Sequence, residues 1–207
     1  MSPLGVLTNP DGFFDRASDD PSLVGPALVV AVVAAISAAA SLPAVRAVQQ
    51  AFTGEASAAG SFALVGGVVG GFVAVFVFWA LYTVVFHVLA TVAFDGSGSL
   101  GRLLAYVGWG HIPAVVSAGT SAVVNVVVFR AVTPPSNPQQ IQGFVRSVRS
   151  QPEFLVAGVV GLVVLVWQGL VWTFAVQHSH DIDLRSAAIT VAVPVGLQAL
   201  WQLWNLF

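Results

Sequence analysis

The fold is decided by residues Phe62 to Phe94, FALVGGVVGGFVAVFVFWALYTVVFHVLATVAF, an apolar run of 33 residues without a charged side chain. An α-helix rises about 1.5 Å per residue, so this run would be about 50 Å long, against a hydrocarbon core of about 30 Å. Two spans would need about 17 residues each and a polar turn between them, and no turn chemistry lies between Phe72 and Ala93. The run therefore predicts one long transmembrane helix that tilts or projects from the bilayer.

The composition places the whole chain in a membrane. Of its 207 residues, 57% are hydrophobic and 8% are charged, whereas charged residues make up about 25% of a soluble domain. On both sides of the long run, further apolar stretches are long enough to span a bilayer. They are Leu23 to Leu42, the run that follows Pro113 and ends at Phe129, the run from Phe154 to Val176, and the run from Ser186 to Phe207.

These stretches predict an all-α fold, a polytopic membrane protein with five transmembrane helices and short interfacial helices. Residues 1–22 are expected to form a short N-terminal interfacial or cytoplasmic segment, and residues 23–207 the five-span membrane domain. The expected location is the cell membrane, which the chain crosses several times.

Charge and cysteine content exclude several functions. The seven basic residues are all Arg and the net charge is −2, so no basic face is available for nucleic acid. Without Cys, the chain has no disulfide, thiolate metal site or cysteine nucleophile. We expect no cofactor and no nucleic-acid partner.

The residues before and after the first span predict its ends. Asp20 is interpreted as a helix cap with Pro21 at the first helical position, and Pro43 is expected to stop the helix. Before it, Pro10 to Phe14 is interpreted as a turn followed by an aromatic pair. The pair is expected to lie at the headgroup level, with a protein-binding motif as the alternative.

Four glycines at the start of the longest span are spaced for helix packing. Gly66 and Gly70, like Gly67 and Gly71, are four residues apart, which reduces one helix face to backbone. Close contact with another helix is therefore expected at this face. Phosphate binding is disfavoured because no strand precedes the glycines and no Lys follows them.

A polar turn at residues 95–99 is followed by an amphipathic pattern over residues 100–107, with Arg102 on the polar side. This pattern is typical of a short helix in the membrane interface. Gly108, Gly110 and Pro113 then interrupt the helical pattern, so we expect a broken helix. Freed backbone groups there should be covered by neighbouring helices or open onto a cavity.

Polar side chains in the later spans predict helix contacts. Gln168 is expected to bond another helix, and Gln198, Gln202 and Asn205 should face inward because amides that face lipid are penalised. Residues 141–149, with two Arg away from the apolar face, predict a second interfacial helix.

One group of ionisable residues is a candidate functional spot. An ionisable residue within a membrane span is a functional candidate, and His87 is the only one in its span. His111 lies in the predicted helix break, which the long span approaches through the turn at Asp95. We expect His87, Asp95 and His111 to lie on one side of the domain, with structural hydrogen bonding favoured over ligand or proton handling.

The densest group of possible metal ligands consists of His178, His180, Asp181 and Asp183. Two His at a spacing of two, with carboxylates beside them, could hold a divalent ion. No further His lies nearby, and loop carboxylates at a membrane face are usually solvated. The favoured interpretation is therefore a solvated loop without a metal.

Several short elements occur in the order in which one family of membrane proteins has them. The first two are Pro10, Phe13 and Phe14 before the first span, and a Gly-Ser turn at 96–99. They are followed by an aromatic-small-x-x-Pro element at 106–113, a loop with an Arg-x-Ala helix start at 180–187, and Pro194. On these residues the chain resembles the Yip domain family, whose eukaryotic members are named for binding Ypt/Rab GTPases. The resemblance implies five spans, a cytoplasmic N-terminus and, in eukaryotic members, roles in membrane traffic or organisation. The Arg-only, Ala- and Val-rich composition indicates a prokaryotic member.

Five spans place the N-terminus and the turns around Ser97 and Asp181 on one side of the membrane. That side would carry three of the Arg residues and the other side four, so the positive-inside rule does not choose an orientation. The orientation is taken from the family resemblance.

Three function classes remain. A non-enzymatic membrane-organising or scaffold protein is favoured, with the lipid bilayer and a membrane-protein partner or second copy as its contacts. The alternative is a transporter or channel component with a polar path through the bundle. An intramembrane enzyme would need converging polar groups, and the sequence contains no catalytic motif. The first two differ in whether the inward polar side chains line a water-accessible cavity or are individually buried.

Overall fold

Five long helices form the body of the protein. The computed structural model describes residues 3–17, 20–49, 56–135 and 137–206. Within this part of the chain, five helices are long and apolar enough to cross a membrane, and no strand is present. They are α3 (Val24–Gln49), α4 (Ala56–Phe94), α6 (Ala114–Ala131), α8 (Pro152–His180) and α9 (Leu184–Leu206). The predicted all-α, five-span fold is confirmed, and the long run is a single helix.

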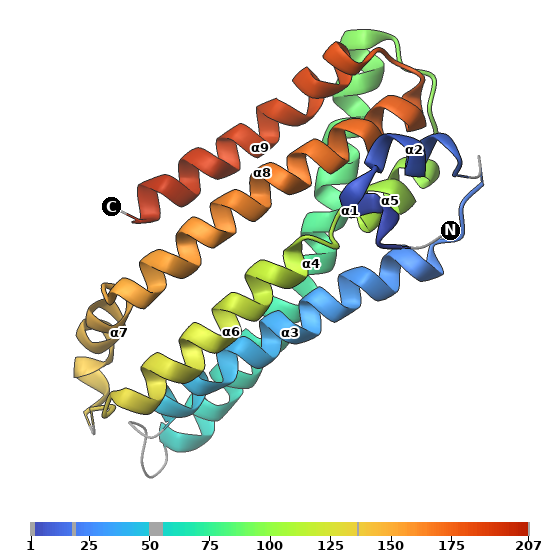
Figure 1. Cartoon of the computed structure of the whole chain (residues 1–207). Coiled ribbons are helices and arrows are strands. Elements are labelled where there is room, and N and C mark those ends of the chain that lie inside the picture. The colour runs from blue at the N-terminus through green and yellow to red at the C-terminus, as the bar shows by residue number, and fades with distance from the viewer. Residues whose placement is uncertain (1–2, 18–19, 50–55, 136, 207) are drawn as a thin grey trace.

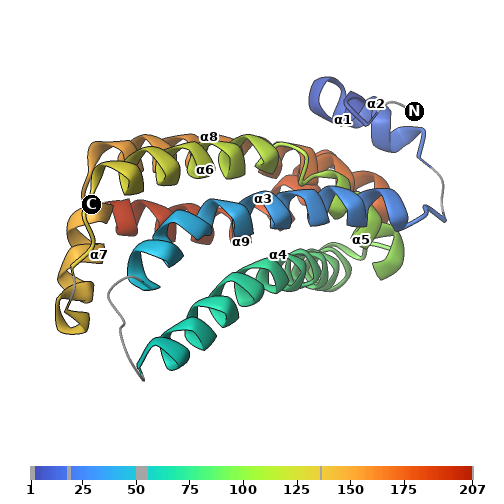
Figure 2. The same cartoon turned by 90° about the horizontal axis from the view of Figure 1, so that it is seen from below.

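The five helices are arranged as a ring. Helix α3 packs on α6, α6 on α8, α8 on α9, α9 on α4, and α4 again on α3. All five run side by side along the long axis of the molecule (Figure 1). Seen from below, α4 approaches the other helices at one end of the molecule and diverges from them at the other (Figure 2). The two ends of the ring therefore differ in how closely they are packed.

Three short helices and two turns close one end of the bundle, which we call the cap end. It comprises α1 (Gly5–Thr8), α2 (Pro10–Asp15), α5 (Leu100–Trp109) and the turns at residues 95–99 and 181–183. The backbone N–H of Ser97 donates to the carbonyl of His180 at 3.1 Å, and His178 contacts Asp11 at 2.7 Å. The N-terminal segment and both turns thus lie at the same end, as the five-span topology predicts.

The N-terminal aromatic pair is buried in protein, so the predicted turn and the predicted contact of the pair with headgroups were both wrong. Pro10 to Asp15 is a helix rather than a turn, because the Asn9 side chain accepts from the N–H of Gly12 and Pro10 starts the helix. Phe13 and Phe14 are 6% and 0% exposed. Both rings pack on α5 and α8 rather than against headgroups, since these helices offer an aromatic surface at the same end.

Both predicted ends of the first span were also wrong. Helix α3 begins at Val24 rather than Pro21, because Ser22 Oγ accepts from the N–H of Val24 and Pro26 takes the place of a first-turn proline. Pro43 lies inside the helix, which continues to Gln49. Within a bundle, neighbouring helices and hydroxyl side chains tolerate a proline that would stop an isolated helix, and Ser41 Oγ here donates to a carbonyl of the preceding turn.

The predicted solvated loop that holds His178, His180, Asp181 and Asp183 is helical as far as His180. Helix α8 continues through His180 and ends at Asp181, whose φ of 54° is left-handed. The polar end of this helix is held by tertiary contacts of His178 and His180, which a sequence pattern does not contain. Asp183 then caps α9 by accepting from the N–H of Ser186 at 3.1 Å.

Helix α5 was correctly predicted as a short helix, but it lies within the protein. Leu103, Ala105 and Val107 are fully buried and Tyr106 is 1% exposed. Helices α3, α4 and α8 all pack on it, so its apolar side faces protein instead of the membrane interface.

The opposite end, which we call the groove end, is more open. It contains the 3₁₀ turn η1 (Pro138–Gln140), the predicted amphipathic helix α7 (Ile141–Arg149) and the C-terminus of α9. Helix α7 buries Val148 and exposes both of its Arg side chains. This helix connects α6 to α8 across the end of the bundle.

Candidate functional site

The predicted helix break is present and is covered by protein. Helix α5 ends at Trp109 and α6 begins at Ala114, and His111 between them is 7% exposed. Its Nδ1 donates to the carbonyl of Val107 at 2.9 Å, and its ring lies 5.4 Å from that of Trp172. Burial lowers the pKa of His111 to about 4, so the imidazole is neutral at neutral pH.

Side chains from α4 and α8 satisfy the carbonyls around the break. Trp172 Nε1 donates to Val107 at 3.0 Å, and Gln168 Nε2 donates to Gly110 at 3.4 Å. Trp79 Nε1 donates to a carbonyl on α5 at 2.9 Å. Gln168 was predicted to bond another helix, and it bonds the residue that caps the C-terminus of α5. The break is therefore a structural joint, because each of these donors would otherwise be unpaired in an apolar interior.

A second polar cluster joins the ends of α4 and α8. His87 Nδ1 lies 2.8 Å from His180 Nε2, and His180 Nδ1 lies 2.9 Å from Ser179 Oγ. Ser179 Oγ donates to the carbonyl of Val176, so it accepts from His180 Nδ1–H. His180 Nε2 is then the acceptor and His87 Nδ1–H the donor.

The structure divides the predicted spot in two. His87 pairs with His180, whereas His111 bonds within its own turn, and no hydrogen bond or ring contact between described residues joins either to Asp95. Asp95 is exposed and ends α4 with a φ of 54°. A shared functional role for His87, Asp95 and His111 stays a proposal. Their geometry favours structural hydrogen bonding.

The possible metal ligands do not gather into a metal site among the described residues. No group of three or more His, Asp or Glu side chains there could hold an ion. His178 instead contacts Asp11, and His180 contacts His87. Asp183 is held by Ser186, whose hydroxyl and N–H bonds lower the pKa of the Asp183 carboxyl.

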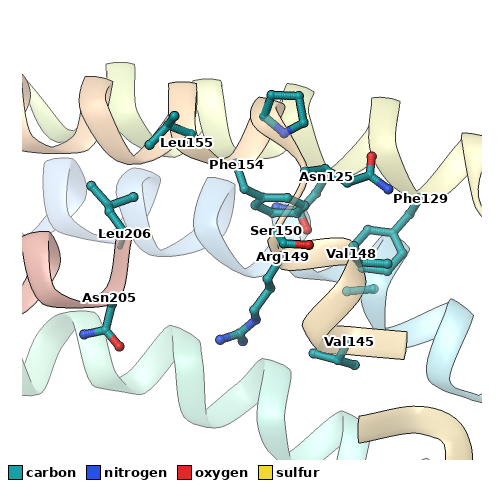
Figure 3. Close-up of a pocket in the computed structure, with 13 residues that line it drawn as sticks. Asn125, Phe129, Val145, Val148, Arg149, Ser150, Phe154, Leu155, Asn205 and Leu206 are labelled. Carbon is teal, nitrogen blue, oxygen red and sulfur yellow. The ribbon is translucent and has the colours of Figure 1, made fainter. Parts of the chain in front are cut away.

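At the groove end, two adjoining hollows of about 730 and 810 Å³ lie between α3, α6, α7, α8 and α9. We call them together the amide groove. Asn125, Arg149 and Asn205 line both hollows, and Figure 3 shows the Arg149 side chain extending into the opening between α7 and the end of α9. Gln168, Gln198 and Gln202 line the second hollow.

The amides of the groove are partly satisfied within the protein. Asn125 Nδ2 donates to the Ser121 carbonyl at 2.9 Å, and Tyr82 donates its hydroxyl to Gln198 Oε1. The inward orientation predicted for the polar side of the last span is therefore confirmed for Gln198 and Gln202, and these side chains also share one cavity.

The inner end of the amide groove is closed by an aromatic core. Trp79, Phe86 and Trp172 are 7%, 0% and 2% exposed, and they pack with apolar residues of α5, α8 and α9. Because Trp172 lies one turn beyond Gln168 on α8, the groove ends near the middle of the bundle. In this structure the groove is therefore blind.

The glycine face on α4 has no neighbour in the described part of the chain. A Cβ built on Gly66, Gly67, Gly70 or Gly71 would meet no atom within 4 Å. Close packing at this face would need another chain, and it stays a prediction. Gly158 on α8, by contrast, is a true packing notch, because a Cβ there would overlap the Leu206 side chain.

Sequence reasoning missed three contributors to these sites. Arg149 was assigned to the polar side of an interfacial helix, and its place at the groove was not foreseen. Trp172 was not singled out, although a Trp inside an apolar span needs a hydrogen-bond acceptor, and this need is a usable indication. The His87–His180 pair joins residues 93 positions apart, and no local pattern indicates it.

The described charges are divided between the ends. The cap end carries six Asp and three Arg, whereas the groove end carries four Arg and Glu153. The groove end is therefore electropositive relative to the cap end.

Comparison with known proteins identifies a family. The sequence pattern of the Yip1 domain matches residues 4–206, nearly the whole chain. No curated protein and no solved structure matches it. The match confirms the resemblance carried by the short sequence elements.

Proposed function

Because the chain belongs to the Yip1 domain family, we propose that it is a non-enzymatic, membrane-organising protein of the cell membrane. Its apolar helices make it a multi-pass membrane protein in contact with lipid. In this proposal the bundle receives and holds another membrane component at the groove end, and the cap end keeps the helices in register.

The observation that carries the proposal is the form of the amide groove. Polar side chains from five helices converge on it, and the aromatic core closes its inner end. A blind groove can bind a molecule, but it provides no path across the bilayer. The polar networks near the cap end hold helix ends together, and Ser179 is 1% exposed, which keeps its hydroxyl from a substrate.

The experiment is affinity purification of the full chain in mild detergent, with bound proteins and lipids identified by mass spectrometry. Gly161→Leu fills the groove, because its Cβ would meet a single neighbour, Gln202 Oε1, at 3.9 Å. Gly119→Leu on α6 is the matched control, since a Cβ there meets nothing within 4 Å and Gly119 does not line the groove. We expect a stoichiometric component that Gly161→Leu loses and Gly119→Leu retains.

A transporter or channel component is the second candidate. The observation that favours it is that Asn125, Gln168, Gln198 and Asn205 line one cavity, as a polar path requires. Ion and small-solute flux into proteoliposomes separates the two. Flux through the native chain that Gly161→Leu blocks would contradict the membrane-organising proposal.

A further inference from the structure

The amide groove has one charged side chain in its described lining, and that side chain is unpaired. Arg149 lines both hollows, and no described residue forms an ion pair or hydrogen bond with its guanidinium. Glu153, one turn further along the chain, does not line either hollow. A guanidinium presents a planar set of N–H donors that matches phosphate, so the groove mouth is suited to a phosphate-bearing ligand.

The surroundings of Arg149 also favour an anion. Arg46, Arg130 and Arg146 are exposed at the same end, and Glu153 is the only acidic residue described there. Basic side chains near a membrane surface attract anionic headgroups by about 1 kcal/mol each. Charge complementarity therefore selects a negatively charged headgroup over a zwitterionic one.

The walls of the groove show that the ligand is amphipathic. Phe129, Phe154 and Leu155 line the first hollow beside Arg149, whereas amides line the deeper part of the second. Gln202 has no hydrogen bond among the described residues, and Asn205 uses its Nδ2 within α9 while its oxygen is unbonded. These groups can bond glycerol or ester oxygens, and the apolar side chains can contact a hydrocarbon chain.

The groove is open on the side from which a lipid would enter. Helix α4 completes the ring, yet no described residue of α4 lines either hollow, and its N-terminal half diverges from α9 (Figure 2). The amphipathic helix α7 carries Arg149 at its end, and helices of this kind lie among the lipid headgroups. A lipid in the bilayer could therefore enter sideways with its phosphate already beside Arg149.

From these observations we propose that the amide groove binds one anionic glycerophospholipid, with its phosphate at Arg149 and its hydrocarbon along the wall formed by α6 and α8. The inference rests on the proposed function, because it names the membrane component that the groove holds.

The test measures lipid binding to the full chain in detergent by native mass spectrometry, with phosphatidylglycerol and phosphatidylcholine as probes. Arg149→Gln should weaken phosphatidylglycerol binding about fivefold. Arg146→Gln, on the same helix but outside the groove lining, should change it less than twofold. Gly161→Leu should weaken binding of both lipids, and Gly119→Leu neither.

Equal losses in Arg149→Gln and Arg146→Gln would overturn the inference, because binding would then reflect general surface charge. The melting temperature with inorganic phosphate is the second check. If inorganic phosphate raises it as much as phosphatidylglycerol does, and if the rise requires Arg149, the ligand is a soluble anion and the inference is overturned. If lipid binding does not depend on Arg149 and no flux occurs, the inference fails while the membrane-organising proposal stands. Flux blocked by Gly161→Leu contradicts the proposed function itself.

Discussion

The cap end and the groove end are built from the same apolar helices but are packed differently. At the cap end, short helices and two turns fill the space between the helix ends, and Tyr106, Phe14 and His180 are almost fully buried. At the groove end, the helices enclose hollows of about 730 and 810 Å³, and one face of α4 has no described neighbour. The difference indicates that the cap end contributes more to stability, and the groove end is where we propose that a ligand binds.

The physical basis of this difference is the lack of a hydrophobic driving force between helices in lipid. Apolar helices in a bilayer associate through close contact and hydrogen bonds. The cap end supplies both, since donors from Trp79, Gln168 and Trp172 bond backbone carbonyls around the α5–α6 joint. Substitutions there should therefore cost more than substitutions at the groove end.

The largest expected effect is that of Phe14→Ala. Phe14 is 0% exposed and its ring centroid lies 4.9 Å from that of Tyr106. Removing a buried Phe side chain costs about 3 to 5 kcal/mol, so the melting temperature in detergent should fall and amides of α2 should exchange faster. Phe78→Ala, at a 56% exposed position on α4, is the control. Equal melting of the two variants would show that the cap end is not the stable part.

Gly98→Ala should have the next largest effect. A Cβ at Gly98 would overlap the backbone carbonyl of Ser179, and backbone cannot move aside as a flexible side chain can. Overpacking of this kind costs about 1 to 3 kcal/mol, measured as a lower melting temperature. Gly101→Ala, where a Cβ meets nothing within 4 Å, should melt as the native chain does. An unchanged melting temperature for Gly98→Ala would contradict the close contact of the first turn with the end of α8.

His111 should make the cap end sensitive to acid. Its pKa is lowered to about 4 in the fold, against about 6.5 in the unfolded chain. The stabilisation that comes from neutral His111 is therefore fully present above pH 6.5 and is lost as the pH falls toward 4. At pH 5.5 the loss should be roughly 1 kcal/mol.

The measurement for His111 is the melting temperature between pH 7.5 and 4.5, compared with His111→Asn, which cannot titrate but retains a donor for the Val107 carbonyl. The native chain should lose more stability on acidification than the variant. His178→Asn, at a partly exposed position, is the control for a histidine outside the buried joint. Parallel curves for the native chain and His111→Asn would contradict a neutral, buried His111.

The smallest effect is expected on the α4 glycine face. A Cβ at Gly67 meets no described atom within 4 Å, so in the monomer the stability of Gly67→Leu should stay within about 0.5 kcal/mol of that of the native chain, as for ordinary surface substitutions. A clear loss would instead support the sequence-based prediction of helix packing, through contact with a second chain. Sedimentation of both proteins in detergent distinguishes these outcomes, since a second copy changes the mass.

Local sequence patterns predicted the elements well where one physical cause dominates. The charge-free run at residues 62–94 lies within the single helix α4, because the backbone in hydrocarbon must satisfy its own hydrogen bonds. Gly108, Gly110 and Pro113 predicted the break before α6. Predictions failed where contacts with other parts of the chain determine the local structure, as at Pro43 and at the polar end of α8.

The candidate sites were predicted only in part. His87 and His111 were identified as unusual polar groups in an apolar chain, but their partners, His180 and Trp172, lie 93 and 61 positions away. The inward side of α9 was predicted from the cost of exposing amides to lipid. The cavity that these amides share depends on how far apart the surrounding helices stand, and no periodicity contains that spacing.

Sequence patterns alone predict that this is a membrane protein, how many times the chain crosses the bilayer, where the α5–α6 break falls and to which family the chain belongs. These properties follow from the local cost of placing charges, amides and unpaired backbone in hydrocarbon. The tertiary structure alone decided that Phe13 and Phe14 seal the cap end, that His87 meets His180, and that Arg149 lines an open groove. Those features depend on contacts between distant segments, whose energies are set only once the helices have packed.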